Sequence, residues 1–282
     1  MKYNSKLLTP LIVYLFLVGI LTLSTSAQSQ GKWSVFTSFQ LTRGTYNLEN
    51  TTNTYAFYGG LRYKSSQWSI VASLPVIGQN NTSLTNTGGV FFPTRHHGNG
   101  GGTETPHHGG GMSEVSLEDQ FVMGMGDIYV NGEYQVLNEG ENVPYIGATA
   151  RLKLPTANKA HNFGTGETDY GLGLTFRKRF EMYWVVMDLG FWKIGDPDSL
   201  NLQDVKTLGI GVGRFFQGNR LGIMLYFENY SRFIKELEPV RQLTFAINSR
   251  ISTNTFFLVT GGKGITNTSP DFTLGVGLEL IL

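Results

Sequence analysis

Residues 145–176 read YIGATARLKLPTANKAHNFGTGETDYGLGLTF, and the glycines in the second half raise the question of a phosphate-binding loop. Such a loop lies between a buried apolar strand and a helix. Here the residues after the loop alternate in character. Tyr170, Leu172 and Leu174 fall on one face of an extended chain, with small or polar residues between them. Because side chains repeat with a period of two in a strand, the pattern predicts two strands joined by a loop.

The same alternation recurs along the chain and predicts about twelve strands. Long connections such as RGTYNLENTTN (43–53) alternate with short ones such as NEGEN (138–142), without exception. This alternation is typical of outer-membrane barrels, which have short periplasmic turns and long extracellular loops. The predicted fold class is therefore all-β, a closed antiparallel up-and-down transmembrane β-barrel. The expected strands are 32–42, 54–64, 67–77, 124–137, 143–155, 168–179, 182–194, 204–216, 219–231, 239–251, 254–263 and 271–282.

The two faces of the expected strands differ in polarity. Leu221, Ile223 and Leu225 alternate with residues such as Gly222 and Glu228 on the other face of the same strand. The apolar face suits lipid and the polar face suits a lumen. Open sheet edges do not occur in lipid, so the sheet has to close. Aromatic residues expected at the lipid interfaces are Trp33, Tyr55, Tyr63, Trp68, Tyr183 and Phe191.

Composition narrows the functional classes. Glycine is abundant, with 36 residues in 282, and charged residues make up 15%, against a usual ~25%. The net charge of +1 gives the protein no strongly positive electrostatic potential, so nucleic acid is not an expected partner. The absence of cysteine excludes disulfides, thiolate chemistry and cysteine-based metal sites.

Both ends of the chain carry signals for export and assembly. Lys2 and Lys6 precede an apolar run at 7–23, so residues 1–27 are expected to be a signal peptide that is cleaved after Ala27. A retained anchor is the alternative, but the run is marginal for a span of about 20 residues. The end of the chain, FTLGVGLELIL, resembles the terminal strand that bacterial barrel-assembly machinery recognises, although it ends in Leu282 instead of Phe. Residues 28–282 are thus expected to form a barrel in the cell outer membrane, with lipid and the assembly machinery as partners.

Two segments, GMGDIYVNGEYQVL (124–137) and LPTANKAHNFGTGETDYGLGL (154–174), together resemble one family of outer-membrane proteins. The family pattern has GxGD at the start of a strand, then a Lys-x-Pro-Thr segment, then a loop that closes in GTG-x-x-D. The chain matches this pattern at Gly124, Gly126, Asp127, Lys153, Pro155, Thr156, Gly164, Thr165, Gly166 and Asp169. This is the MetA-pathway of phenol degradation family, whose members are often described as transporters. The resemblance covers about 124–176, and it implies a barrel and the passage of small, often aromatic, molecules.

Charged residues on the expected lumen face form the candidate site of solute selection. One interpretation is a polar constriction that selects solutes, and the other is a network of salt bridges that stiffens a narrow barrel. The pattern leaves both open and points to no catalytic residue. The candidates are Arg62, Asp127, Glu133, Arg151, Lys153, Asp169, Arg177 and Glu228.

The most unusual local composition lies in the connection 78–123, which is expected to be a long extracellular loop rich in His and Gly. Its segment 96–111 contains His96, His97, His107 and His108, and paired imidazoles can bind Zn²⁺, Cu²⁺ or Ni²⁺. Seven of the sixteen residues are glycines, however, and ordering them around a metal would cost much entropy. A surface loop or a loop that plugs the lumen is the competing interpretation.

The leading functional prediction is an outer-membrane channel or transporter for small solutes, including hydrophobic or aromatic ones. The remaining histidine, His161, has no patterned serine partner, so an enzyme is not expected, and neither is a cofactor. The alternatives are a non-transporting structural or adhesive surface barrel, a metal-responsive surface protein that uses the His/Gly loop, and a soluble secreted β-protein.

Overall fold

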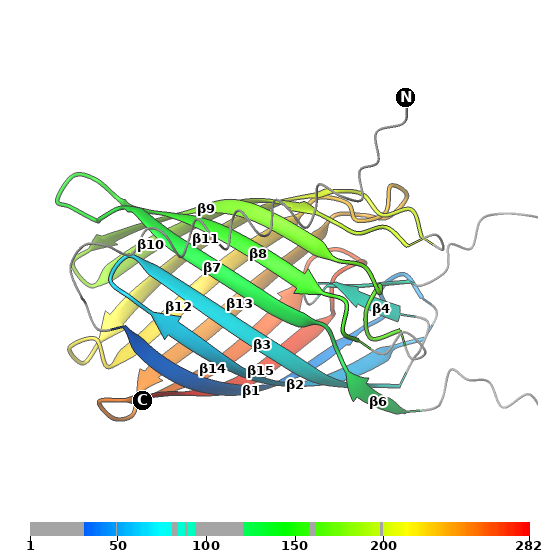
Figure 1. Cartoon of the computed structure of the whole chain (residues 1–282), viewed down its shortest axis with the longest axis horizontal. Coiled ribbons are helices and arrows are strands. Elements are labelled where there is room, and N and C mark those ends of the chain that lie inside the picture. The colour runs from blue at the N-terminus through cyan, green and yellow to red at the C-terminus, as the bar shows by residue number, and fades with distance from the viewer. Residues whose placement is uncertain are drawn as a thin grey trace, which may run out of the picture. The chain divides into compact units, whose positions relative to one another are not determined.

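The computed structural model describes residues 31–48, 50–80, 84–87, 90–93, 121–157, 162–197 and 200–282. Residues 32–282 form one compact unit built from β-strands (Figure 1). The expected signal peptide and all five histidines lie outside the described residues. Within the described ranges, no helix has the length and apolar character of a membrane span.

The strands form a sheet that closes on itself. Consecutive wall strands pair antiparallel, and β1 (Lys32–Gly44) pairs with β15 (Phe272–Ile281) to complete the cylinder. β6 (Val122–Met125) and β7 (Ile128–Leu137) both pair with β3 (Trp68–Gln79), so they are two parts of one wall strand. The 13-stranded sheet therefore makes a barrel of twelve wall strands (13 − 1), which confirms the predicted fold. The other wall strands are β2 (Thr52–Lys64), β8 (Tyr145–Leu154), β9 (Asp169–Phe180), β10 (Tyr183–Lys193), β11 (Val205–Phe216), β12 (Leu221–Tyr230), β13 (Val240–Arg250) and β14 (Thr255–Gly264).

A β-bulge separates β6 from β7. Two residues of β3 there face the three residues 126–128. Pro75, which has no N–H for the ladder, lies at this point, and its carbonyl accepts the Gly126 N–H at 2.8 Å. One extra residue exchanges the two faces of a strand. Met125 is consequently exposed on the outside, whereas Asp127 turns away from solvent and is only 1% exposed.

The outer surface of the barrel is apolar. Leu172 and Leu225, for example, are 64% and 44% exposed, as expected for side chains that face lipid. Three of the expected interfacial rings pack against one another in tilted pairs. The ring centroids of Trp33 and Tyr63 lie 4.9 Å apart, and those of Tyr63 and Trp68 lie 4.9 Å apart. Such a contiguous apolar surface is typical of membrane contact.

The two ends of the barrel differ in their connections, as the sequence predicts. One end, here called the turn end, carries the short connections, and the Leu282 N–H donates there to the Trp33 carbonyl at 2.8 Å. The other end, here called the loop end, carries the long ones. The turn-end connections are 65–67, 138–144, 181–182, 217–220 and 251–254, and the loop-end connections are 45–51, 80–121, 155–168, 194–204, 231–239 and 265–271.

Part of the connection 80–121 folds back against the barrel wall. β4 (Leu84–Thr87) and β5 (Val90–Pro93) form an antiparallel hairpin at the loop end (Figure 1). Leu84 is fully buried, and burying such a side chain contributes about 1.5–3 kcal/mol. The hairpin is therefore held by apolar packing. One buried cluster joins it to residues of the wall and the loops: Val90, Phe92, Trp192, Ile194, Leu202, Val205, Tyr230, Phe233, Ile234 and Val240.

The glycine-rich loop 155–168 also packs against the wall. Phe163 is 2% exposed and lies in a cluster with Ala56 and Ile77. Gly166 has a φ of 75°, which is favourable only for glycine. Gly164 is needed for a different reason, because a Cβ at that position would overlap the Asp127 carboxylate.

Candidate functional site

The charged residues proposed from the sequence fall into three separate groups, and the first lies toward the turn end. Arg62 forms an ion pair with Glu279 at 3.5 Å, and Arg177 forms one with Glu133. The Tyr145 hydroxyl donates to Glu133 at 2.5 Å, and the Arg177 guanidinium lies 4.2 Å from the Tyr145 ring centroid. The charges of this group are thus paired between strands that have one other strand between them, β1 in the first pair and β8 in the second.

The second group is a buried cluster around Lys153 at the loop end. Its ammonium lies 2.7 Å from Asp169 Oδ2 and 3.6 Å from Asp127 Oδ2, and all three side chains are 1% exposed. Lys153 also donates to Thr165 Oγ1 at 2.8 Å and to Thr87 Oγ1 at 2.9 Å, while the Thr87 hydroxyl donates to Asp169. Thr87 belongs to the β4–β5 hairpin, so the cluster ties the hairpin to the barrel wall.

Backbone donors bind one oxygen of each carboxylate in this buried cluster. The Ala157 N–H donates to Asp127 Oδ1 at 2.9 Å, and the Gly195 N–H donates to Asp169 Oδ1 at 2.8 Å. Buried charges are tolerated when opposite charges and hydrogen bonds replace the lost water. Two carboxylates and one ammonium leave a net negative charge, and these N–H groups help to offset it. The contacts are those of an anchor that joins wall, hairpin and two loops.

The hairpin is also clamped on its other side by Tyr46 of the connection 45–51. Tyr46 is 1% exposed and packs with Leu84 and Phe91, whose ring centroid lies 5.6 Å from that of Tyr46. Burial, with a smaller contribution from the Asp271 carboxylate, raises the pKa of the Tyr46 hydroxyl. The clamp is therefore uncharged at neutral pH.

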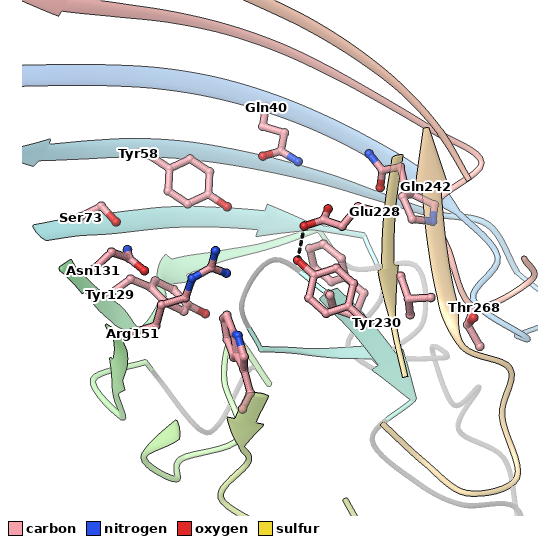
Figure 2. A pocket seen from close by; sticks show the side chains of 15 residues that line it. Gln40, Tyr58, Ser73, Tyr129, Asn131, Arg151, Glu228, Tyr230, Gln242 and Thr268 are labelled. Atoms are coloured by element: carbon pink, nitrogen blue, oxygen red, sulfur yellow. Dashed lines mark hydrogen bonds between the residues drawn. The ribbon is translucent and has the colours of Figure 1, made fainter. Parts of the chain in front are cut away.

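The third group lies in a cavity of about 330 Å³ inside the barrel (Figure 2). The cavity is bounded on one side by β5 of the hairpin and on the others by strands from around the barrel. Its walls combine two charged side chains with amides, hydroxyls and aromatic rings. The lining includes Arg151 and Glu228, the polar residues Gln40, Ser73, Asn131 and Gln242, and the aromatic residues Tyr58, Phe91, Tyr129, Trp192 and Tyr230.

Arg151 and Trp192 are brought together by the sheet register. Arg151 pairs with Gly171 on β9, and Gly171 pairs with Trp192 on β10. A Cβ at Gly171 would lie 3.0 Å from Trp192 Cδ1 and 2.9 Å from the Phe191 carbonyl oxygen. The missing side chain thus lets the indole lean across β9, and the Arg151 guanidinium lies 5.2 Å from its ring centroid.

Glu228 lies in the same cavity on β12. Its Oε1 accepts a hydrogen bond from the Tyr230 hydroxyl at 2.7 Å, drawn as a dashed line in Figure 2. A second carboxylate, Asp188, is saturated by other hydroxyls. It accepts from Thr175 at 2.6 Å and from Tyr226 at 2.8 Å. Arg151 and Glu228 therefore present their charges to the cavity, whereas Asp188 is held within the wall.

Sequence reasoning missed the aromatic half of this cavity. The segment 182–194 has apolar residues on both faces, so polarity alone does not identify its inward face. Asp188 could have done so, because a period of two places Trp192 on the same face as Asp188. Tyr230 shares a face with Glu228 in the same way. Phe91, which comes from the hairpin, has no comparable signal.

The structure does not test the metal interpretation of the His/Gly segment. His96, His97, His107 and His108 lie outside the described residues. In the part of the chain that is described, no group of three or more His, Asp or Glu side chains could hold a metal ion.

Among known proteins, the barrel is similar to solved structures in its fold. No family model and no curated protein sequence matches the chain. The crystal structure of an outer-membrane channel from Pseudomonas putida F1 is similar, with a TM-score of 0.62 and 12% identity over 92% of this chain and 98% of that chain. This chain has the fold of an outer-membrane β-barrel.

Two further solved barrels are more distant. The KdgM porin has a TM-score of 0.48 and 8% identity over 88% of this chain and 98% of its own. The transport unit of the autotransporter AIDA-I from Escherichia coli has a TM-score of 0.48 and 8% identity, over 95% of each chain. At 12% identity, the likeness to the Pseudomonas putida F1 channel establishes the fold and leaves the solute open.

Proposed function

We propose that this protein is a channel of the bacterial outer membrane for small solutes. The observation that carries the proposal is the cavity of about 330 Å³ inside a closed barrel, lined by polar and aromatic side chains. Barrels of about eight strands are filled by side chains, whereas those of 16–18 strands hold an aqueous channel. A barrel of twelve strands lies between these limits, and its interior can admit one small molecule at a time.

Two independent likenesses support this proposal. The segments 124–137 and 154–174 resemble the MetA-pathway of phenol degradation family, and the fold resembles that of an outer-membrane channel. The family resemblance favours small hydrophobic or aromatic solutes. The protein would reach the outer membrane after cleavage behind Ala27, use its C-terminal strand for assembly, and expose its loop end to the outside. It would act without catalysis or a cofactor.

The hairpin closes the path at the loop end. Phe92 is 3% exposed and stacks on Phe233, with ring centroids 5.8 Å apart. Passage then requires the hairpin to move or loosen, since its apolar side chains pack directly against the wall. The charges at the turn end are paired with one another and would narrow the opposite opening.

Flux through the refolded protein in liposomes tests the channel. We expect wild type to admit a small neutral solute such as arabinose and to exclude a tetrasaccharide of the stachyose type. Phe92→Ala should raise the arabinose rate several-fold, because it removes the stacking that holds the hairpin. Phe257→Ala, on the outer surface, is the matched control and should leave the rate unchanged.

Absence of flux in both wild type and Phe92→Ala, with folded barrels in the membrane, would contradict the channel. A non-transporting structural or adhesive barrel would then be the better description. Circular dichroism and the shift in gel mobility on boiling establish that each variant is folded before its flux is compared.

A further inference from the structure

Arg151 places a positive charge in the cavity, and a general channel function does not explain this charge. Its side chain is exposed although it faces the barrel interior (Figure 2). Among the described residues, no side chain forms an ion pair or hydrogen bond with its guanidinium. By contrast, Arg62 and Arg177 are each paired with a carboxylate. With respect to the described residues, the Arg151 donors are therefore open to a ligand.

The position of this guanidinium is set by its neighbours. Gly171 leaves the space through which Trp192 reaches toward Arg151, and the cation lies over the indole ring. An arginine that lies over an aromatic ring keeps its planar set of N–H donors at the edge of the guanidinium, where they can meet a ligand. Holding the donors in place before binding reduces the entropy cost of binding an anion.

The remainder of the cavity suits a flat ring with a donor group. Tyr58, Tyr129 and Phe91 supply aromatic surface around the space. Glu228 accepts one hydrogen bond from Tyr230, and a carboxylate has capacity for several more. A ligand that binds Arg151 through an acid group could thus donate a hydroxyl hydrogen to Glu228.

We propose that this cavity is a selectivity site for small aromatic acids that carry a hydroxyl group. Arg151 binds the carboxylate through two parallel N–H···O bonds, the ring contacts Trp192 and the tyrosines, and Glu228 accepts from the hydroxyl. The inference rests on the proposed channel function and narrows its solute class. The cavity volume of about 330 Å³ lies at the lower end of small-molecule sites.

Other ligand classes fit the same walls less well. A neutral hydrocarbon would displace water from Arg151 and Glu228 without replacing its hydrogen bonds, which is unfavourable for both groups. A phosphate monoester, with close to two negative charges, would meet one guanidinium and the opposing Glu228 carboxylate. An aromatic acid brings one negative charge and one donor, which matches the two charged side chains.

Calorimetric titration of the full-length refolded barrel tests the site with 4-hydroxybenzoate as the probe. We expect saturable binding to wild type, and binding of 4-hydroxybenzamide that is weaker by about tenfold or more, because the amide lacks the charge. Arg151→Gln should weaken binding of the acid by a similar factor and leave the amide unchanged. Glu228→Gln should reduce the preference for 4-hydroxybenzoate over benzoate.

Arg241→Gln is the matched control. Arg241 lies at the same end of the barrel, and its Nε donates to Asn229 at 3.0 Å outside the cavity. This variant should bind 4-hydroxybenzoate as wild type does. If Arg151→Gln and Arg241→Gln lose the same affinity for 4-hydroxybenzoate, the loss comes from the change in net charge and the proposal is overturned.

Arabinose flux measured on the same preparations separates this proposal from the channel proposal. If arabinose passes but wild type does not bind 4-hydroxybenzoate, or if Arg151→Gln binds it with unchanged affinity, the selectivity site is wrong and the channel stands. If the acid binds in an Arg151-dependent way but no solute passes, the site stands as a binding site and the channel is wrong.

Discussion

Lys153 shows how much a single side chain contributes to the loop end. Lys153→Met would leave Asp127 and Asp169 buried without a cation, and breaking a buried ion pair in this way costs roughly 3–5 kcal/mol. We expect the free energy of unfolding in urea to fall by about that amount.

Lys193→Met provides the comparison for that measurement. Lys193 pairs with Asp204 at 3.0 Å, but its side chain is 52% exposed. An exposed pair of this kind contributes ~1 kcal/mol or less, so the variant should unfold almost as wild type does. Losses of equal size in the two lysine variants would show that the Lys153 cluster does not anchor the fold.

Adjacent residues on one strand test the assignment of faces. Leu174 is 41% exposed on the outside, while Thr175 is buried and donates to Asp188. Leu174→Arg places a charge in lipid at a cost of roughly 2–4 kcal/mol, whereas an arginine at 175 can pair with Asp188. The fraction of protein that assembles in membranes should therefore fall more for Leu174→Arg. Equal yields would mean that the faces are assigned wrongly.

At the scale of elements, the connection 80–121 combines a packed hairpin with the His/Gly segment 96–111, which lies outside the described residues. We predict that deletion of 96–111 leaves the barrel assembled, because the hairpin and the wall keep their own contacts. Solute flux in liposomes should stay the same or rise.

The same deletion distinguishes the metal interpretation. Titration of the intact protein with Zn²⁺ and Cu²⁺ should show no tight stoichiometric binding if the segment serves only as a loop. Tight binding that disappears with His96, His97, His107 and His108 would contradict this expectation and support a metal-responsive surface protein.

For the whole molecule, the two ends of the barrel should face opposite compartments. The chain contains no cysteine, so single-cysteine variants report their own position. Lys235→Cys at the loop end and Glu141→Cys at the turn end both replace exposed residues. A membrane-impermeant thiol reagent should label the first in intact cells and the second only after permeabilisation. The reverse pattern would invert the proposed orientation.

The sequence by itself determined the barrel, because two of its patterns depend only on local chemistry. Alternating polarity indicates which face of a strand meets lipid. Alternating connection lengths indicate that successive strands run up and down between two different ends of the barrel. These signals predicted twelve strands and the inward position of residues such as Arg151, Lys153 and Glu228. They contain no information on which inward residues meet, since that depends on the register between strands distant in sequence.

Tertiary structure decided the division of the interior. The bulge at 126–128 turns Asp127 toward Lys153, and the register across β8, β9 and β10 aligns Arg151, Gly171 and Trp192. The inward fold of the hairpin depends on apolar surface that exists only once the barrel has closed. A short apolar segment in a loop has no apolar surface near it in the sequence to pack against. The position of the hairpin could therefore not be predicted before the walls that cover it were known.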